Sequence, residues 1–254
     1  MRRPHLLAGL AFAVAVGGCA LHRPRPLRPT TADELIAGLA ARRSAVGSLR
    51  ASGRLRTGLS GLWTREAILV RRPDALRIDV LSPFGLALAV GVHGPVMWAY
   101  PAREGTRYEG PATAENLARF LGAPIAVGDV VDVLLGVPPR RTPVASPALV
   151  ATRDGEYRLT LPLTQGAQTL WFAGDTLVVR RAEEGHGEVV VFRVAFDDYR
   201  DGFPYVVDVA APTRGASARL AYDAVEPNAA VDPALFAPPP AARVRPLEPA
   251  AEPG

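Results

Sequence analysis

The feature that most limits the possible folds is a long series of short apolar segments separated by Gly, Pro or Asp. About five of these segments follow one another between residues 49 and 100, and about six more lie between residues 156 and 225. Short apolar segments with turn residues between them are typical of consecutive antiparallel strands. We therefore predict a mostly β (α+β) fold with about 11 strands in an antiparallel sheet.

Two of the predicted strands have an alternating pattern. Trp63 and Leu69 share one side of one segment, and Ile78 and Val80 share one side of the next, where Arg77 lies between the apolar residues. Alternation of this kind is typical of a sheet with one apolar face and one polar face. We expect a strongly curved sheet with its apolar face inside.

Three other stretches have the spacing of amphipathic helices. Thr31 begins a capping-box pattern, which predicts a helix over residues 32–43. Residues 113–121 and 127–135 place apolar side chains at intervals of three and four, and Gly136 is suited to follow the second of these helices. We expect an N-terminal helix and a short helical lid over the mouth of the sheet. This spacing leaves open whether the interior beneath the lid is a filled core or a cavity.

The first residues have the pattern of an export signal. Arg2 and Arg3 precede an apolar run over residues 6–16, which is too short to span a bilayer. Small residues then lead to Cys19, the only cysteine in the chain, so an internal disulfide is impossible. The segment resembles a bacterial lipobox, and we predict a lipoprotein signal peptide over residues 1–18 with lipidation of Cys19. The alternative is an ordinary secretory signal with a chance cysteine at its end.

Shifts in composition mark the other boundaries. Residues 19–30 are rich in Arg and Pro and are predicted to be a tether from the lipidated cysteine to the domain. Residues 31–236 form the predicted domain, and residues 237–254 are predicted to be a disordered Pro/Ala-rich tail. In enteric bacteria an Asp directly after the lipidated cysteine retains lipoproteins in the inner membrane, so Ala20 favours the outer membrane.

Several kinds of chemistry have no support in the sequence. The chain contains no Lys, which excludes a P-loop and a Schiff-base nucleophile. Its four histidines lack the spacing of metal ligands, and no serine has the flanking glycines of a hydrolase nucleophile elbow. A formal net charge of +4 without a basic helix gives no basis for nucleic-acid binding. We expect a monomeric protein that is not an enzyme and has no metal or cofactor.

Between about residues 50 and 140 the chain contains, in order, Ser82–Gly85 with the strand after it, Tyr108-Glu109 with the helix that follows, Leu121–Ile125 and Leu134–Pro138. This ordered set resembles the LolA/LolB superfamily of lipoprotein carriers, and LolB-like outer-membrane receptors in particular. The resemblance implies an open antiparallel β-barrel whose cavity takes up acyl chains beneath a helical lid. It also implies acylated lipoproteins or lipids as ligands, a LolA-like periplasmic carrier as partner, and a lipid-anchored position on the outer membrane of a Gram-negative bacterium, facing the periplasm.

The resemblance assigns roles to individual residues. LolB-like proteins have an exposed apolar residue in the loop that Phe84 occupies here, so Phe84 is expected to face the membrane; the alternative is that it folds back onto the core. Ten residues from the apolar faces of strands and lid are expected to form the wall of the acyl-chain cavity: Trp63, Leu69, Ile78, Leu88, Trp98, Leu117, Phe120, Leu121, Val130 and Leu134. A second function remains open, namely an envelope assembly or sensor lipoprotein with the same fold, a filled cavity and a protein partner.

Overall fold

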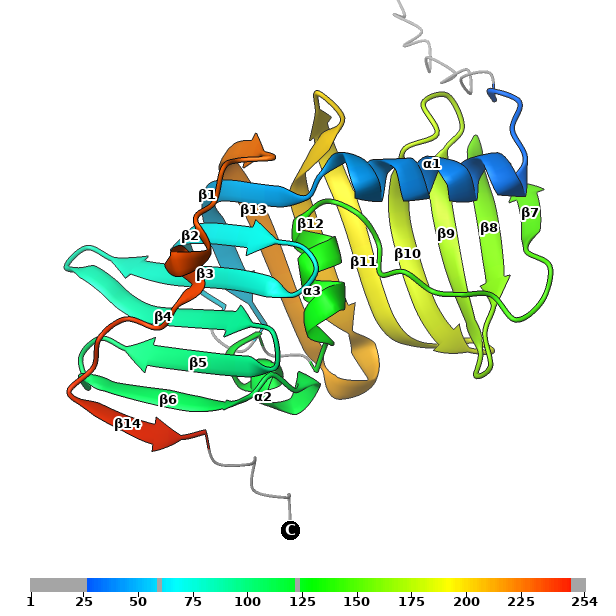
Figure 1. Cartoon of the computed structure of the whole chain (residues 1–254). Coiled ribbons are helices and arrows are strands. Elements are labelled where there is room, and N and C mark those ends of the chain that lie inside the picture. Colours follow the sequence, from blue (N-terminus) through cyan, green and yellow to red (C-terminus); the bar gives the residue numbers. More distant parts are fainter. Residues whose placement is uncertain (1–26, 59–60, 122–123, 248–254) are drawn as a thin grey trace, which may run out of the picture.

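The computed structural model describes residues 27–58, 61–121 and 124–247 (Figure 1). The predicted signal peptide, Cys19 and most of the predicted tether lie outside the described residues, as do residues 248–254.

Fourteen strands of the described chain form a single sheet (Figure 1). The strands are β1 (Ser48–Thr57), β2 (Trp63–Arg71), β3 (Ala75–Ser82), β4 (Gly85–His93), β5 (Val96–Pro101), β6 (Thr106–Pro111), β7 (Ala148–Ala151), β8 (Glu156–Pro162), β9 (Ala167–Ala173), β10 (Val179–His186), β11 (Val189–Arg200), β12 (Phe203–Ala211), β13 (Ala216–Pro227) and β14 (Arg243–Pro246). Their order across the sheet is β14-β6-β5-β4-β3-β2-β1-β13-β12-β11-β10-β9-β8-β7.

The sheet is curved and open, with β14 and β7 at its two edges (Figure 1). The pairing of β1 with both β2 and β13 joins the N-terminal strands to the C-terminal ones. All neighbouring strands are antiparallel except β14 and β6, which are parallel. The predicted mostly β, open and curved architecture is confirmed, although the strand number is higher than expected because β6, β7 and β14 have little apolar alternation.

The C-terminal tail is more ordered than its composition predicts. Within the stretch expected to be disordered, β14 pairs with β6, and the backbone N–H of Leu247 donates to the carbonyl of Glu109 at 2.7 Å. The Leu247 side chain is buried in the core. The prediction of disorder is therefore wrong for residues 243–247.

Helix α1 (Ala32–Ala45) lies across the strands of the C-terminal half, in front of β8 to β11 (Figure 1). Its start is fixed by the predicted capping box between Thr31 and Glu34. The chain just before it is held on the sheet, because Arg28 N–H donates to the Gly174 carbonyl at 2.7 Å and the Tyr157 hydroxyl donates to the Arg28 carbonyl at 2.9 Å. The last residues of the predicted tether are therefore part of the folded domain.

Two further helices follow β6. Helix α2 (Ala114–Leu121) lies near the end of β6, and α3 (Val127–Leu134) lies inside the curve of the sheet (Figure 1). Gly136 follows α3 with a φ of 75°, and the N–H groups of Gly136 and Val137 donate to the carbonyls of Val133 and Asp132. This is a Schellman motif, which confirms the predicted helix end.

The sheet has apolar side chains on both faces in its N-terminal half. Side chains of the inner face pack with side chains of α1, α2 and α3 to form the main core. The outer face of β2 and β3 packs against a separate cluster, formed mainly by the 3-10 helix η2 (Pro233–Phe236) and the chain before it. The members of this outer cluster are Ala75, Ala229, Val231 and Phe236, with Leu69 packed against them.

Candidate functional site

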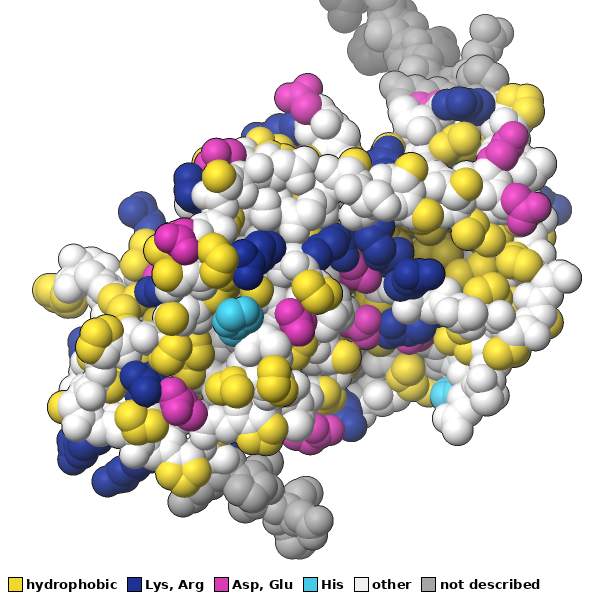
Figure 2. Space-filling view, viewed as in Figure 1, with side chains coloured by type: hydrophobic (Ala, Val, Ile, Leu, Met, Phe, Trp, Pro, Cys, Tyr) yellow, Lys and Arg dark blue, Asp and Glu magenta, His cyan; other side chains and the backbone are white. Residues whose placement is uncertain are grey.

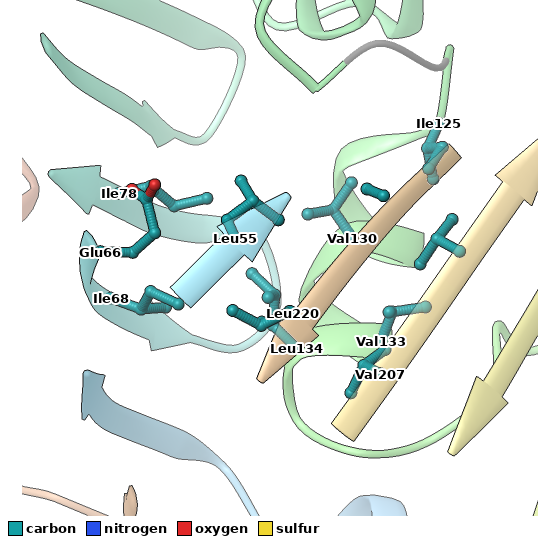
Figure 3. Close-up of a pocket in the computed structure, with 12 residues that line it drawn as sticks. Leu55, Glu66, Ile68, Ile78, Ile125, Val130, Val133, Leu134, Val207 and Leu220 are labelled. Atoms are coloured by element: carbon teal, nitrogen blue, oxygen red, sulfur yellow. The ribbon is translucent and has the colours of Figure 1, made fainter. Parts of the chain in front are cut away.

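A cavity of about 80 Å³ lies between α3 and the inner face of the sheet (Figure 3). Strands β1, β2, β3, β12 and β13 contribute its other walls. Apart from Glu66, the described side chains that line it are all apolar: Leu55, Ile68, Ile78, Ile125, Val130, Val133, Leu134, Val207, Val209, Ala218 and Leu220. The interior is therefore neither completely filled nor widely hollow.

The volume sets a limit on what the closed protein can hold. A water molecule needs roughly 10–15 Å³ by the same kind of measure, so the cavity has room for roughly five to eight such volumes. This is space for part of one hydrocarbon chain. A complete acyl chain would need α3 to move away from the sheet.

The structure brings three of the ten predicted wall residues to this cavity. Ile78 on β3 and Val130 and Leu134 on α3 all line it. Leu88, Leu117 and Phe120 pack in the surrounding core without lining the cavity. The side chain of Leu121 lies outside the description.

Three predicted wall residues lie on the opposite face of the sheet. Successive side chains of a strand point to opposite faces, and Glu66 and Ile68 face the cavity, so Trp63 and Leu69 face outwards. Trp98 also lies on the outer face of the sheet, where it is buried and its Nε1–H donates to the carbonyl of Phe236 at 3.0 Å. The prediction is wrong for these three residues because the outer face has an apolar cluster of its own.

Glu66 is the cavity residue that the sequence analysis missed. It is 2% exposed, and its Oε1 lies 2.6 Å from the hydroxyl of Thr64. Its Oε2 is buried and has no hydrogen-bond partner within the part of the chain that the structure describes. Burial raises the pKa of Glu66 to about 7; the hydrogen bond from Thr64 opposes this rise, and the like charge of Asp79 adds to it.

Ion pairs hold the polar side of α3. Asp132 accepts from Arg43 of α1, at 2.8 Å between Oδ2 and Nη2, and also from Arg72, which follows β2. The Asp132 side chain is 8% exposed, and the two arginine side chains are about 20% exposed. Because these partners come from α1 and from the end of β2, the pairs fix α3 over the cavity.

Two further ion pairs, both made by Arg141, connect α3 to β10. Arg141 donates to Asp129 of α3 at 2.7 Å and to Glu184 at 3.0 Å. Burial raises the pKa of Glu184, although the charge of Arg141 acts in the opposite direction. At the cavity side, the buried hydroxyl of Tyr222 donates to the carbonyl of Leu134 at 2.9 Å. Any outward movement of α3 would have to break these contacts.

The tip of the β3–β4 hairpin presents Phe84 to solvent. Ser82 pairs with Gly85 across a two-residue turn, and its hydroxyl accepts from the Phe84 N–H and donates to the Gly85 carbonyl. Gly85 has a φ of 106°, a conformation that favours glycine. The Phe84 side chain is 92% exposed, so it does not fold back onto the core.

Other exposed apolar side chains lie at the same end of the sheet. Arg65 pairs with Leu81, so the start of β2 lies beside the end of β3. Leu62, Trp63 and Leu81 are 71%, 45% and 41% exposed, and the Arg54 guanidinium lies over the Trp63 ring. We call Leu62, Trp63, Leu81 and Phe84 the apolar end. Hydrophobic and basic side chains are interspersed over this part of the molecule, at the left of Figure 2.

Metal-binding clusters and membrane-spanning helices are both absent from the described residues. Within residues 27–58, 61–121 and 124–247, no three His, Cys, Asp or Glu side chains are grouped so that they could hold a metal ion. Over the same ranges, no helix has the length and apolar character needed to cross a membrane.

Known proteins resemble this chain in structure but not in sequence. No family model matches the chain, and no curated protein matches its sequence. A solved structure of a DUF1329 family protein from Desulfovibrio piger is similar, with a TM-score of 0.57, 13% identity, and coverage of 81% of this chain and 95% of that one.

Two other solved structures share this architecture. One is a LolA superfamily protein from Nitrosomonas europaea, with a TM-score of 0.53, 13% identity, and coverage of 83% of this chain and 99% of that one. The other is a putative outer membrane lipoprotein-sorting protein domain from Vibrio parahaemolyticus, with a TM-score of 0.52, 12% identity, and coverage of 81% and 97%. The chain has a LolA-like open β-barrel fold.

Proposed function

We propose that this protein is a lipid-anchored carrier or receptor that binds the acyl chains of lipoproteins, or of related lipids, and delivers them to the outer membrane. The observation that carries this proposal is the cavity beneath α3, which is apolar except for Glu66. The LolA-like fold supports it, because one of the similar structures is described as a lipoprotein-sorting domain.

Transfer in this proposal depends on differences in affinity. Each CH₂ group that passes into water costs ~0.8 kcal/mol, so an acyl chain must move between apolar compartments. The cavity would bind the acyl chain more tightly than the donor protein does, and the membrane would bind it more tightly than the cavity does. No chemical reaction is needed.

Helix α3 acts as the lid in this mechanism. The cavity is smaller than a whole acyl chain, so binding must move α3 away from β1 and β13 and weaken its ion pairs. Asp132 is the central group, since it joins α3 to both Arg43 and Arg72. The bound chain would replace lost lid contacts with its own apolar contacts.

The apolar end is proposed to meet the membrane during delivery. Burying a Phe side chain contributes about 1.5–3 kcal/mol, and Phe84 is almost completely exposed. Leu62, Trp63 and Leu81 would add further apolar contact with the bilayer interface. Together with lipidated Cys19, these side chains would orient the domain on the membrane facing the periplasm.

Gentle purification followed by native mass spectrometry tests the proposal. The wild-type protein is expected to carry lipid or lipopeptide, or to accept an acylated lipopeptide when it is added. Ala218→Phe should reduce this occupancy because Ala218 lines the cavity. Val150→Phe is the control, since Val150 is 48% exposed on the edge strand β7.

The small volume of the cavity favours one alternative, an envelope assembly or sensor lipoprotein that binds a protein partner. In that case the wild-type protein would reproducibly lack bound lipid and would not bind the acylated lipopeptide. Ala218→Phe would then have no effect on either measurement. That result would contradict acyl-chain transport.

A further inference from the structure

Glu66 is an unusual residue for the wall of an acyl-chain cavity. It lies on β2, it is only 2% exposed, and no donor among the described residues reaches its Oε2. A buried acceptor without a donor destabilises a folded protein, and an apolar side chain in its place would not. The structure therefore contains an acceptor that a ligand could satisfy.

We propose that Glu66 accepts a hydrogen bond from the group that attaches a bound acyl chain, so that the cavity prefers chains attached through an N–H or O–H group over simple ester-linked chains. This inference rests on the proposed function and names its ligand class: an acyl chain with a donor, such as an amide N–H, within reach of Glu66.

Thr64 positions the carboxyl group for this role. Its Oγ1 lies 2.6 Å from Glu66 Oε1 and 3.2 Å from the Leu55 carbonyl. When the carboxyl is protonated, Oε1–H can donate to Thr64, while the Thr64 hydroxyl donates to Leu55. When it is ionised, Thr64 donates to Oε1. With the proton on Oε1, or with the carboxyl ionised, Oε2 is an acceptor without a donor. The preference should therefore be strongest above the raised pKa of about 7, where the ionised form predominates.

The surroundings of Glu66 leave the ligand as the natural donor. The lining side chains that face it from β1, β2, β3 and α3 include Leu55, Ile68, Ile78 and Val130, none of which can donate a hydrogen bond. The charge that acts on Glu66, Asp79, has the same sign and cannot neutralise it. An ester group would place its own acceptor oxygens in the same apolar space and could not satisfy Oε2.

Competitive displacement of a fluorescent fatty-acyl probe tests this inference with N-methyldodecanamide and methyl dodecanoate. Both ligands have the same acyl chain, but the amide has an N–H group at the position where the ester has an oxygen atom. The wild-type protein is expected to bind the amide about tenfold more tightly. Glu66→Leu should lose the preference for the amide, because it has no acceptor to offset the cost of burying the amide N–H.

Glu66→Gln is the matched control. Its amide can donate to Thr64 and leave a carbonyl oxygen towards the ligand, so most of the preference for the amide should remain. Circular dichroism and thermal melting establish that both variants are folded. Glu66→Leu is expected to be folded, since it removes a buried unpaired oxygen.

The outcomes separate this inference from the proposed function. Equal binding of both ligands by the wild-type protein, or an unchanged preference in Glu66→Leu, would overturn the role of Glu66 and leave acyl-chain binding intact. Failure of the wild-type protein to bind the probe or either ligand would overturn both.

Discussion

Replacement of Glu66 by glutamine should change how the stability of the protein depends on pH. Glu66 is buried among apolar side chains, and burial raises its pKa from the usual 4.5 to about 7. Because the folded state binds this proton more tightly than the unfolded state, the stabilisation is fully present below about pH 4.5 and is lost as pH rises through about 7.

The size of the effect follows from the two pKa values. The interval between 4.5 and about 7, at about 1.4 kcal/mol for each pH unit, corresponds to about 3 kcal/mol. The glutamine side chain of the variant cannot titrate. The wild-type protein should therefore lose about 3 kcal/mol relative to Glu66→Gln between about pH 4 and about pH 8.

Urea unfolding of both proteins across this pH range measures the difference. Other titrating groups contribute equally to both proteins, so they cancel when the two free energies of unfolding are subtracted. The expected result is a difference that changes steadily between about pH 5 and about pH 7.5. Parallel curves for the two proteins would show that Glu66 has an ordinary pKa and would refute its desolvation in the cavity.

Three other perturbations test the lid, the apolar end and the anchor. Phe84→Glu should leave the fold intact and weaken binding to anionic vesicles by roughly 10- to 100-fold. The control, Val150→Glu on the exposed face of β7, should have little effect on this binding. Equal losses of binding in the two variants would argue against a special role for Phe84. Asp132→Asn should lower the free energy of unfolding by about 3 kcal/mol, because it removes the charge that pairs with two arginines, and should increase hydrogen exchange in α3; unchanged exchange would show that these pairs do not hold the lid. Cys19→Ala should release the protein from the membrane fraction, and a variant that still sediments with membranes would contradict lipid anchoring.

Local sequence patterns predicted much of the fold. Thr31 and Gly136 mark helix ends through hydrogen bonds with residues close in the chain, so their patterns can be recognised without a structure. Most strands were found from their apolar segments and turn residues. The edge strands β7 and β14, and β6 beside β14, were missed, because strands at or near an edge bury less surface and need less apolar alternation.

The candidate site was harder to predict. In β2, Trp63 and Leu69 on one face and Ile68 on the other are all apolar, so alternation alone does not identify the inner face. The charge of Glu66 favoured the wrong choice, since a carboxylate is normally expected outside. The outer cluster around Phe236 depends on a segment that is distant from β2 and β3 in the chain, and no local pattern reveals that contact.

The measurement that tests the central claim most directly is photo-crosslinking with a diazirine-labelled fatty-acyl probe, followed by mapping of the labelled residues by mass spectrometry. If acyl chains enter the cavity beneath α3, labels should fall on its lining, including Val133, Val207 and Leu220, and Ala218→Phe should reduce them. Labels confined to the outer face of the sheet, or a pattern unaffected by Ala218→Phe, would contradict an acyl-chain site inside the barrel.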